Sequence, residues 1–262
     1  MNDSIYGPLQ IREVFHLEFL RWFGRKLEAD CYALKGGVNL RLFFKSIRYS
    51  EDMDIDITKV SVQKVKKTVM EILSIRGFSD SLKSFGIERI VSPDLTKAKQ
   101  TETTQRFKIH LLTSGGEDLF TKIEFSRRGL KGAAVVEPVS SAILRAYKMA
   151  PLLVPHYDAA SAVGQKIHAL AQRTVLQARD VFDLFVLSSQ CEGSKRSKIE
   201  VGRTILKTAH DHIFLVEFPR FRDTVVAYLG AEDQKAYSSA AIWDEIKLKT
   251  AHFLEEFKHE NE

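Results

Sequence analysis

The spacing of apolar positions divides the chain into helical segments, with a period near 3.6, and strands, with a period of two. Before residue 140 the two kinds alternate, whereas nearly every later segment has the helical period. The pattern predicts strands at 31–34, 52–57, 86–92, 105–112, 119–125 and 134–136 and helices at 10–28, 39–44, 61–76, 159–173, 180–187, 196–209 and 239–258. We therefore expect an α/β protein of two lobes, with a mixed sheet in residues 1–140 and helices in residues 141–262.

Composition fits a globular protein with an ordinary core, since 44% of the 262 residues are hydrophobic and 28% are charged. The apolar runs are too short to span a bilayer and no signal peptide is visible, so we expect a cytoplasmic protein without a membrane partner. Cys31 and Cys191 are isolated, which favours reduced thiols over a disulfide framework or zinc site. The net charge of +5 is a mild bias toward polyanions such as nucleic acid or triphosphate.

The strand at 52–57 carries an unusual concentration of acid. Asp52, Asp54 and Asp56 alternate with apolar residues, so a period of two places the three carboxylates on one face. Like charges on one face repel each other, and a divalent cation removes that repulsion. Mg²⁺ prefers hard oxygen ligands and commonly bridges carboxylates to substrate phosphates. The alternative is an exposed edge strand whose charges prevent aggregation.

The preceding predicted strand runs into Gly36-Gly37 and then into a short helix. A glycine turn lets the backbone approach a phosphate, and the first turn of a helix offers it amide N–H groups and a positive dipole. Either motif alone has an ordinary structural explanation, and a Gly-Gly pair is often only a turn. Together, in this order, they indicate a site for a metal and a triphosphate.

These segments resemble a known family. Residues 34–42 (L-K-G-G-V-N-L-R-L) and 48–54 (R-Y-S-E-D-M-D) are similar to motifs of the AbiEii/AbiGii-type nucleotidyltransferase toxins. Residues 166–173, with Lys166 and Arg173, and residues 179–184 (R-D-V-F-D-L) resemble two further motifs of that family. These proteins are the toxins of type IV toxin–antitoxin pairs and belong to the DNA polymerase β-like nucleotidyltransferase superfamily.

The resemblance implies site residues in three roles. It implies catalytic roles for Asp52, Asp54, Lys166 and Asp180. It implies nucleotide binding by Lys35, Gly36, Gly37, Arg48, Ser50, Lys166 and Arg173. It implies metal binding by Asp52 and Asp54, with Glu124 of the strand at 119–125 as a third carboxylate. Many relatives have Gly-Ser at the turn, so the Gly-Gly form leaves backbone amides to bind phosphate.

Several of these assignments have alternatives. Glu124 is either the third metal ligand or a partner of Lys122 on a solvated face. Asp56 is either a spare ligand or a solvated residue at the end of its strand. Lys166 and Arg173 lie seven residues apart on one helix face, which points two cations at triphosphate or forms a solvated stripe. Asp180, or otherwise Asp183, is expected to hold one of these cations in place.

The resemblance implies an enzyme that uses Mg²⁺ or Mn²⁺ to move a nucleoside monophosphate from a nucleoside triphosphate to an acceptor. The implied acceptor is RNA, with tRNA first, and the implied partner is a cognate antitoxin that need not form a stable complex. A basic run from Lys195 to Lys207 can follow phosphates. The alternatives are phosphoryl transfer, a protein hydroxyl as acceptor, and a non-catalytic module that binds RNA or a partner protein.

Overall fold

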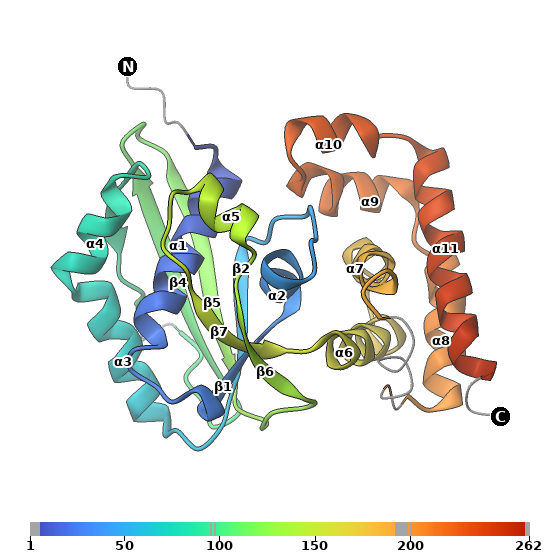
Figure 1. The fold of residues 1–262 in the computed structure, drawn as a ribbon, viewed down its shortest axis with the longest axis horizontal. Helices are drawn as coiled ribbons and strands as arrows, with labels where there is room; N and C mark the ends of the chain where they lie inside the picture. Colours follow the sequence, from blue (N-terminus) through green and yellow to red (C-terminus); the bar gives the residue numbers. More distant parts are fainter. Residues whose placement is uncertain (1–5, 95, 97, 192–198, 200, 260–262) are drawn as a thin grey trace. The chain divides into compact units, whose positions relative to one another are not determined.

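The computed structural model describes residues 6–94, 96, 98–191, 199 and 201–259 (Figure 1). The chain forms two compact units, which are described separately below. The first comprises residues 1–42 and 49–157, and the second comprises residues 43–48 and 158–262. The division lies later than residue 140 because the strand Leu153–Tyr157 pairs with two strands of the first unit.

The first unit is built on one seven-stranded sheet with the order β3-β4-β5-β2-β1-β7-β6. Its strands are β1 (Tyr32–Lys35), β2 (Asp52–Ile57), β3 (Ile87–Val91), β4 (Thr104–Thr113), β5 (Asp118–Ser126), β6 (Ala134–Pro138) and β7 (Leu153–Tyr157). β2 runs parallel to β5 and β1 runs parallel to β7, whereas the other neighbours are antiparallel. The predicted mixed sheet of an α/β fold is therefore confirmed.

The two faces of this sheet differ in chemistry because the central strands alternate apolar and polar residues. Met53, Ile55, Phe107, Ile109 and Ile123 are fully buried on one face. The helices α1 (Pro8–Phe23), α3 (Val62–Ser74) and α4 (Arg76–Lys83) lie on that side (Figure 1). The other face, called the charged face below, carries Asp52, Asp54, Asp56, Arg106, Lys108, Lys122 and Glu124.

Two further helices belong largely or wholly to the first unit, α2 (Gly36–Phe43) and α5 (Ser141–Ala146). α2 begins at Gly36 itself, so the glycine pair forms the first turn of the helix instead of a turn before it. Each of the other predicted strands and helices of this unit corresponds to an observed one with bounds within five residues, whereas α4, α5 and β7 were not predicted.

The second unit is helical, as predicted. It contains α6 (Ala159–Gln172), α7 (Ala178–Ser188), α8 (Arg203–Phe214), α9 (Phe218–Thr224), α10 (Ala231–Ala236) and α11 (Ala240–His259). Asp158 caps α6 by accepting a bond from the Ser161 amide at 2.8 Å. In the core, the Phe221 and Trp243 rings stack with centroids 4.3 Å apart. No helix in the described ranges is both long and apolar enough to cross a membrane.

The helix predicted at 196–209 differs at its start. α8 begins at Arg203, after Gly202 at the N-cap position, and extends to Phe214. Lys195, Arg196 and Lys198 of the predicted basic run lie outside the described residues, whereas Arg203 and Lys207 lie on α8.

His16 of α1 makes the stability of the first unit pH-dependent. Its ring is buried, and Nε2 lies 2.9 Å from the Thr121 hydroxyl, which itself donates to the Glu51 carbonyl. Nε2 of the neutral ring therefore donates to Thr121. Burial, assisted by the charge of Arg12, lowers the pKa of His16 from 6.5 to about 3.

The neutral ring stabilises the fold fully above pH 6.5, and this stability is lost as the pH falls from 6.5 toward 3. We expect the free energy of unfolding to fall over that window by about 5 kcal/mol from this residue. His16→Gln should reduce the slope in denaturant titrations at several pH values, whereas His252→Gln, a change at an exposed histidine, should not. An unchanged slope in His16→Gln would contradict the assignment.

Candidate functional site

The strand register arranges the charged face of the first unit in rows. One row runs from Asp54 of β2 through Glu124 of β5 to Arg106 of β4. The adjacent row runs from Asp52 through Lys122 to Lys108 on the same three strands. The acidic ends of both rows lie side by side on β2.

Asp54 and Glu124, called the acidic pair below, are direct register partners. Like charges directly opposite each other on neighbouring strands are destabilising. Arg106 Nε forms an ion pair with Glu124 Oε2 at 2.6 Å, and Lys122 Nζ forms one with Asp52 Oδ2 at 2.9 Å. The Asp54 carboxylate has neither a hydrogen bond nor an ion pair within the described part of the chain. Burial raises the pKa of Asp54; Lys35 opposes this rise and Glu124 adds to it.

Gly36 brings the start of α2 against Asp54. Its φ of +68° lies in the left-handed region that favours glycine. A Cβ atom at this position would lie only 3.0 Å from Oδ2 of Asp54. The first turn of a helix has amide N–H groups without intrahelical partners and a positive dipole end. The glycine therefore places an anion-binding helix start beside the Asp54 carboxylate.

These residues fit a divalent cation shared with a substrate. No three His, Cys, Asp or Glu side chains in the described ranges converge as a ready-made metal cluster. Mg²⁺ is commonly held by one or two carboxylates together with substrate phosphates. Asp52 and Asp54 can supply such a pair, and Glu124 is the adjacent third carboxylate. A cation there would neutralise the acidic pair and the phosphates.

Asp56 occupies a different environment from the two preceding aspartates. Its side chain is buried, with 3% of the residue exposed, so the interpretation as a solvated end-of-strand residue is wrong. Lys35 Nζ donates to Oδ1 at 2.5 Å and the Tyr157 hydroxyl donates to Oδ2 at 2.7 Å. Asp56 therefore anchors the Lys35 ammonium next to the start of α2.

A second buried network anchors α2 and was not expected from the sequence. Arg41 Nε of α2 donates to Glu13 of α1 at 2.7 Å, and Tyr147 donates to the other Glu13 oxygen at 2.6 Å. The Arg41 guanidinium also lies 4.1 Å from the centroid of the Tyr49 ring. These contacts connect α2 to α1 and to the segment that leads into β2. Ser50, in that segment, donates to the Asp52 carbonyl at 2.8 Å.

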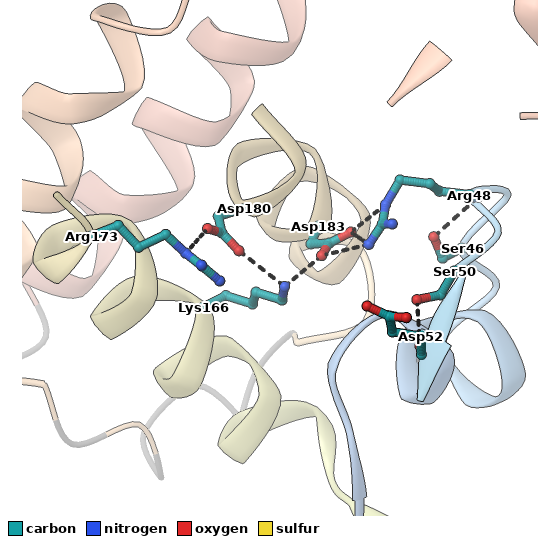
Figure 2. Close-up of polar contacts among 8 residues, drawn as sticks. All are labelled: Ser46, Arg48, Ser50, Asp52, Lys166, Arg173, Asp180 and Asp183. Carbon is teal, nitrogen blue, oxygen red and sulfur yellow. Dashed lines mark hydrogen bonds and ion pairs between the residues drawn. The ribbon is translucent and has the colours of Figure 1, made fainter. Parts of the chain in front are cut away.

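In the second unit, five charged residues form one network, which is buried except at Arg173, whose side chain is 39% exposed (Figure 2). Lys166 Nζ lies 3.1 Å from Asp180 Oδ1 and 2.6 Å from Asp183 Oδ2. Arg173 Nε lies 2.7 Å from the second Asp180 oxygen, outside hydrogen-bond geometry. Arg48 donates to both Asp183 oxygens at 3.0 Å. Both aspartate side chains are fully buried.

The network excludes one of the two interpretations of Lys166, the solvated stripe. Its side chain is 13% exposed and bound to two carboxylates, so it does not belong to a solvated stripe. Burial acts to lower the pKa of Lys166, but Asp183 and Asp180 outweigh it and raise the pKa. Burial acts to raise the pKa of Asp183, but Arg48 and Lys166 outweigh it and lower the pKa. Asp180 bridges Lys166 and Arg173, which is the contact expected of it.

The expected nucleotide-binding residues are thus divided between the units. Lys35, Gly36, Gly37 and Ser50 belong to the first unit, and Arg48, Lys166 and Arg173 belong to the second. Each of the three second-unit cations is paired with Asp180 or Asp183. The expected metal residues Asp52, Asp54 and Glu124 all lie together on β2 and β5.

Gly36→Ala should impair the expected nucleotidyl transfer more than it impairs the fold. The added methyl meets both the left-handed φ and the Asp54 carboxylate, so we expect roughly 1–2 kcal/mol of destabilisation and a tenfold to hundredfold loss of transfer. Gly116→Ala is the matched control, because Gly116 also has positive φ but no atom within 4 Å of the added methyl. Equal losses of activity in the two variants would show that backbone strain alone is responsible.

Comparison with solved structures supports this fold. MenT4, a nucleotidyltransferase toxin from Mycobacterium tuberculosis H37Rv, aligns with a TM-score of 0.59 and 17% identity over 94% of this chain and 84% of that chain. JHP933 from Helicobacter pylori aligns with a TM-score of 0.53 and 17% identity over 98% of this chain and 94% of that chain. At these identities the likeness concerns the fold. No protein with a curated function matches the chain in sequence.

One protein-family model matches most of the chain. The model described as nucleotidyl transferase AbiEii toxin, type IV TA system, matches residues 18–257. That range includes the Gly36-Gly37 helix start, the acidic strand β2 and the network around Lys166. The chain therefore belongs to the AbiEii nucleotidyl transferase toxin family of type IV toxin–antitoxin systems and is a nucleotidyltransferase.

Proposed function

We propose that the chain transfers a nucleoside monophosphate from a nucleoside triphosphate to an RNA hydroxyl, with Mg²⁺ or Mn²⁺ bound by Asp52 and Asp54. One observation carries the proposal. The Asp54 carboxylate, which has no hydrogen bond or ion pair among the described residues, is opposed by Glu124 and lies against a left-handed glycine that starts a helix. This arrangement calls for a cation at the carboxylates and an anion at the helix start, and a metal–triphosphate complex supplies both charges.

The residues of the first unit then have separate tasks. The helix start at Gly36-Gly37 binds phosphate through backbone amides, since no serine hydroxyl is present there. Asp56 and Tyr157 hold Lys35 in position beside that helix start. The Ser50 hydroxyl donates a hydrogen bond to the Asp52 carbonyl and thereby stabilises the start of β2. When bound, the cation offsets the charge of the phosphates and acts as a Lewis acid.

In the second unit, we propose that Lys166 and Arg173 bind the triphosphate and that Asp180 positions both cations. Asp180 contacts each of them. The type IV family implies a cognate antitoxin as partner. We propose that this antitoxin acts without forming a stable complex with the chain.

The test is incubation of the protein with triphosphates labelled on the α- or the γ-phosphate, together with total RNA and total protein, with and without chelator. Nucleotidyl transfer to RNA predicts α-label in RNA, pyrophosphate release and no product in chelator. Transfer of γ-label would contradict nucleotidyl transfer. Label in protein alone, for all four triphosphates, would contradict the RNA acceptor.

A further inference from the structure

A second like-charge pair lies beside the acidic pair on the charged face. Lys108 of β4 and Lys122 of β5 are direct register partners in the adjacent row. Lys122 is paired with Asp52, whereas Lys108 is exposed and has no acidic partner in the described part of the chain. As two like charges opposite each other are destabilising, this pair favours a bound anion, just as the acidic pair favours a cation.

The next row along the same strands is aromatic. Phe120 of β5 and His110 of β4 are register partners whose ring centroids lie 5.5 Å apart. Phe120 remains 39% exposed, and Val91 of the edge strand β3, the partner of His110, remains 40% exposed. An exposed phenylalanine on a sheet face leaves an apolar ring available for stacking.

Positive charge continues beyond the aromatic row. Arg89 of β3 pairs in register with Leu112 of β4 and is exposed, without an acidic partner among the described residues. Among the described residues, two members of these rows contact acids: His110 lies 2.9 Å from Asp118 and Lys122 lies 2.9 Å from Asp52. We call Arg89, Lys108, His110, Phe120 and Lys122 the basic strip. It combines the exposed Phe120 ring with two cations, Arg89 and Lys108, that have no acidic partner among the described residues (β4 and β5 are labelled in Figure 1).

We propose that the basic strip binds the single-stranded end of the acceptor RNA, an inference that rests on the proposed function. Successive rows are two residues apart along each strand, or about 7 Å. The strip therefore begins one row from the acidic pair and leads away from it. Phosphates contact the lysines and Arg89, and a base stacks on Phe120, which places the terminal hydroxyl at the adjacent rows of Asp52 and Asp54.

The chemistry favours single-stranded RNA over two other occupants. In a duplex the bases already stack on each other, so the Phe120 ring would remain unused. An acidic peptide would neutralise the cations, but it need not contain a flat ring that could stack on Phe120. Base–aromatic stacking combined with backbone phosphate contacts is the usual mode for sequence-tolerant binding of single strands.

The test measures binding of a short labelled oligoribonucleotide by fluorescence anisotropy, single-stranded and as a duplex, at several salt concentrations. Phe120→Leu keeps an apolar side chain but removes the ring, and we expect about a fivefold or greater loss of affinity for the single strand. Lys108→Gln should weaken binding and reduce the salt slope by about one. Arg76→Gln, a change at an exposed arginine on α4, is the matched surface control.

Triphosphate binding in Mg²⁺, measured without RNA, separates this inference from the proposed function. Loss of oligoribonucleotide binding in Phe120→Leu and Lys108→Gln, with triphosphate binding retained, is the expected result. Wild-type affinity in both variants would overturn the basic strip even if the enzyme transfers nucleotide to RNA. Equal competition by duplex RNA or by polyglutamate would overturn the single-strand assignment. Failure of the wild-type protein to bind triphosphate would instead contradict the proposed function.

Discussion

Asp54→Ala is expected to reduce nucleotide transfer by roughly 10²- to 10³-fold, the range seen when one electrostatic partner of a reacting group is removed. Asp54 has no hydrogen bond or ion pair in the part of the chain that the structure describes, and it faces both Glu124 and the Gly36 helix start. A truncated side chain cannot hold a cation against the phosphates. Initial rates of α-label transfer at saturating Mg²⁺ measure the effect, and Asp30→Asn, at an exposed ion pair with Lys59, is the control.

The same variant should fold at least as well as the wild type without divalent cations. Because the pKa of Asp54 is raised above 3.8, ionising it opposes folding. The free energy of unfolding of the wild type therefore falls as the pH rises from 3.8 through the raised pKa. Asp54→Ala has no carboxyl at this position, so its free energy of unfolding does not fall for this reason. Thermal unfolding in chelator at several pH values measures it. A variant that is inactive and also unfolded would show that Asp54 is structural, and full activity would contradict metal binding at β2.

Asp183→Asn is expected to destabilise the second unit by about 3–5 kcal/mol, the usual cost of removing one member of a buried ion pair. The Asp183 side chain is fully buried and receives both Arg48 and Lys166. The amide keeps the shape but leaves two buried cations with less compensation. Chemical denaturation measures the difference. Asp223→Asn, at an exposed pair with Arg222, should stay within about 1 kcal/mol of the wild type.

The pH dependence of this effect has a defined sign. The pKa of Asp183 is held below 3.8, so its contribution is fully present above pH 3.8 and is lost as the pH falls through the lowered value. The difference between wild type and Asp183→Asn should therefore be constant at neutral pH and shrink only in strong acid. A difference below 1 kcal/mol at neutral pH would mean that Arg48 and Lys166 do not depend on this carboxylate.

Periodicity and short motifs predicted much of this architecture. Alternating Met53, Ile55 and Ile57 identified β2 and put three aspartates on one face, because a strand's period of two needs no tertiary information. Asp180 or Asp183 was also predicted to hold Lys166 or Arg173 in place, and each forms an ion pair with one of these cations. The end of the first unit was harder to place, since β7 is short and is defined by its pairing with β1 and β6.

Residues whose roles depend on strand register were not predictable. Asp56 was open between two interpretations because its partners, Lys35 and Tyr157, come from neighbouring strands far apart in sequence. Arg48 was expected at phosphate, yet its partner Asp183 lies 135 positions away. The Lys108–Lys122 pair is visible only once β4 and β5 are aligned. The alternation of residues within a strand predicts the face of the sheet on which each residue lies, whereas the register between strands decides which charged side chains meet.

The proposed function requires Asp52 and Asp54 to hold a divalent cation together with a triphosphate. Electron paramagnetic resonance of Mn²⁺, titrated with protein at constant triphosphate, tests this most directly because free Mn²⁺, the Mn²⁺–triphosphate complex and its protein-bound form give different signals. We expect the protein-bound signal for the wild type and Asp30→Asn only with triphosphate present, and not for Asp54→Ala. Equal protein-bound signals for Asp54→Ala and the wild type would contradict metal binding at Asp54.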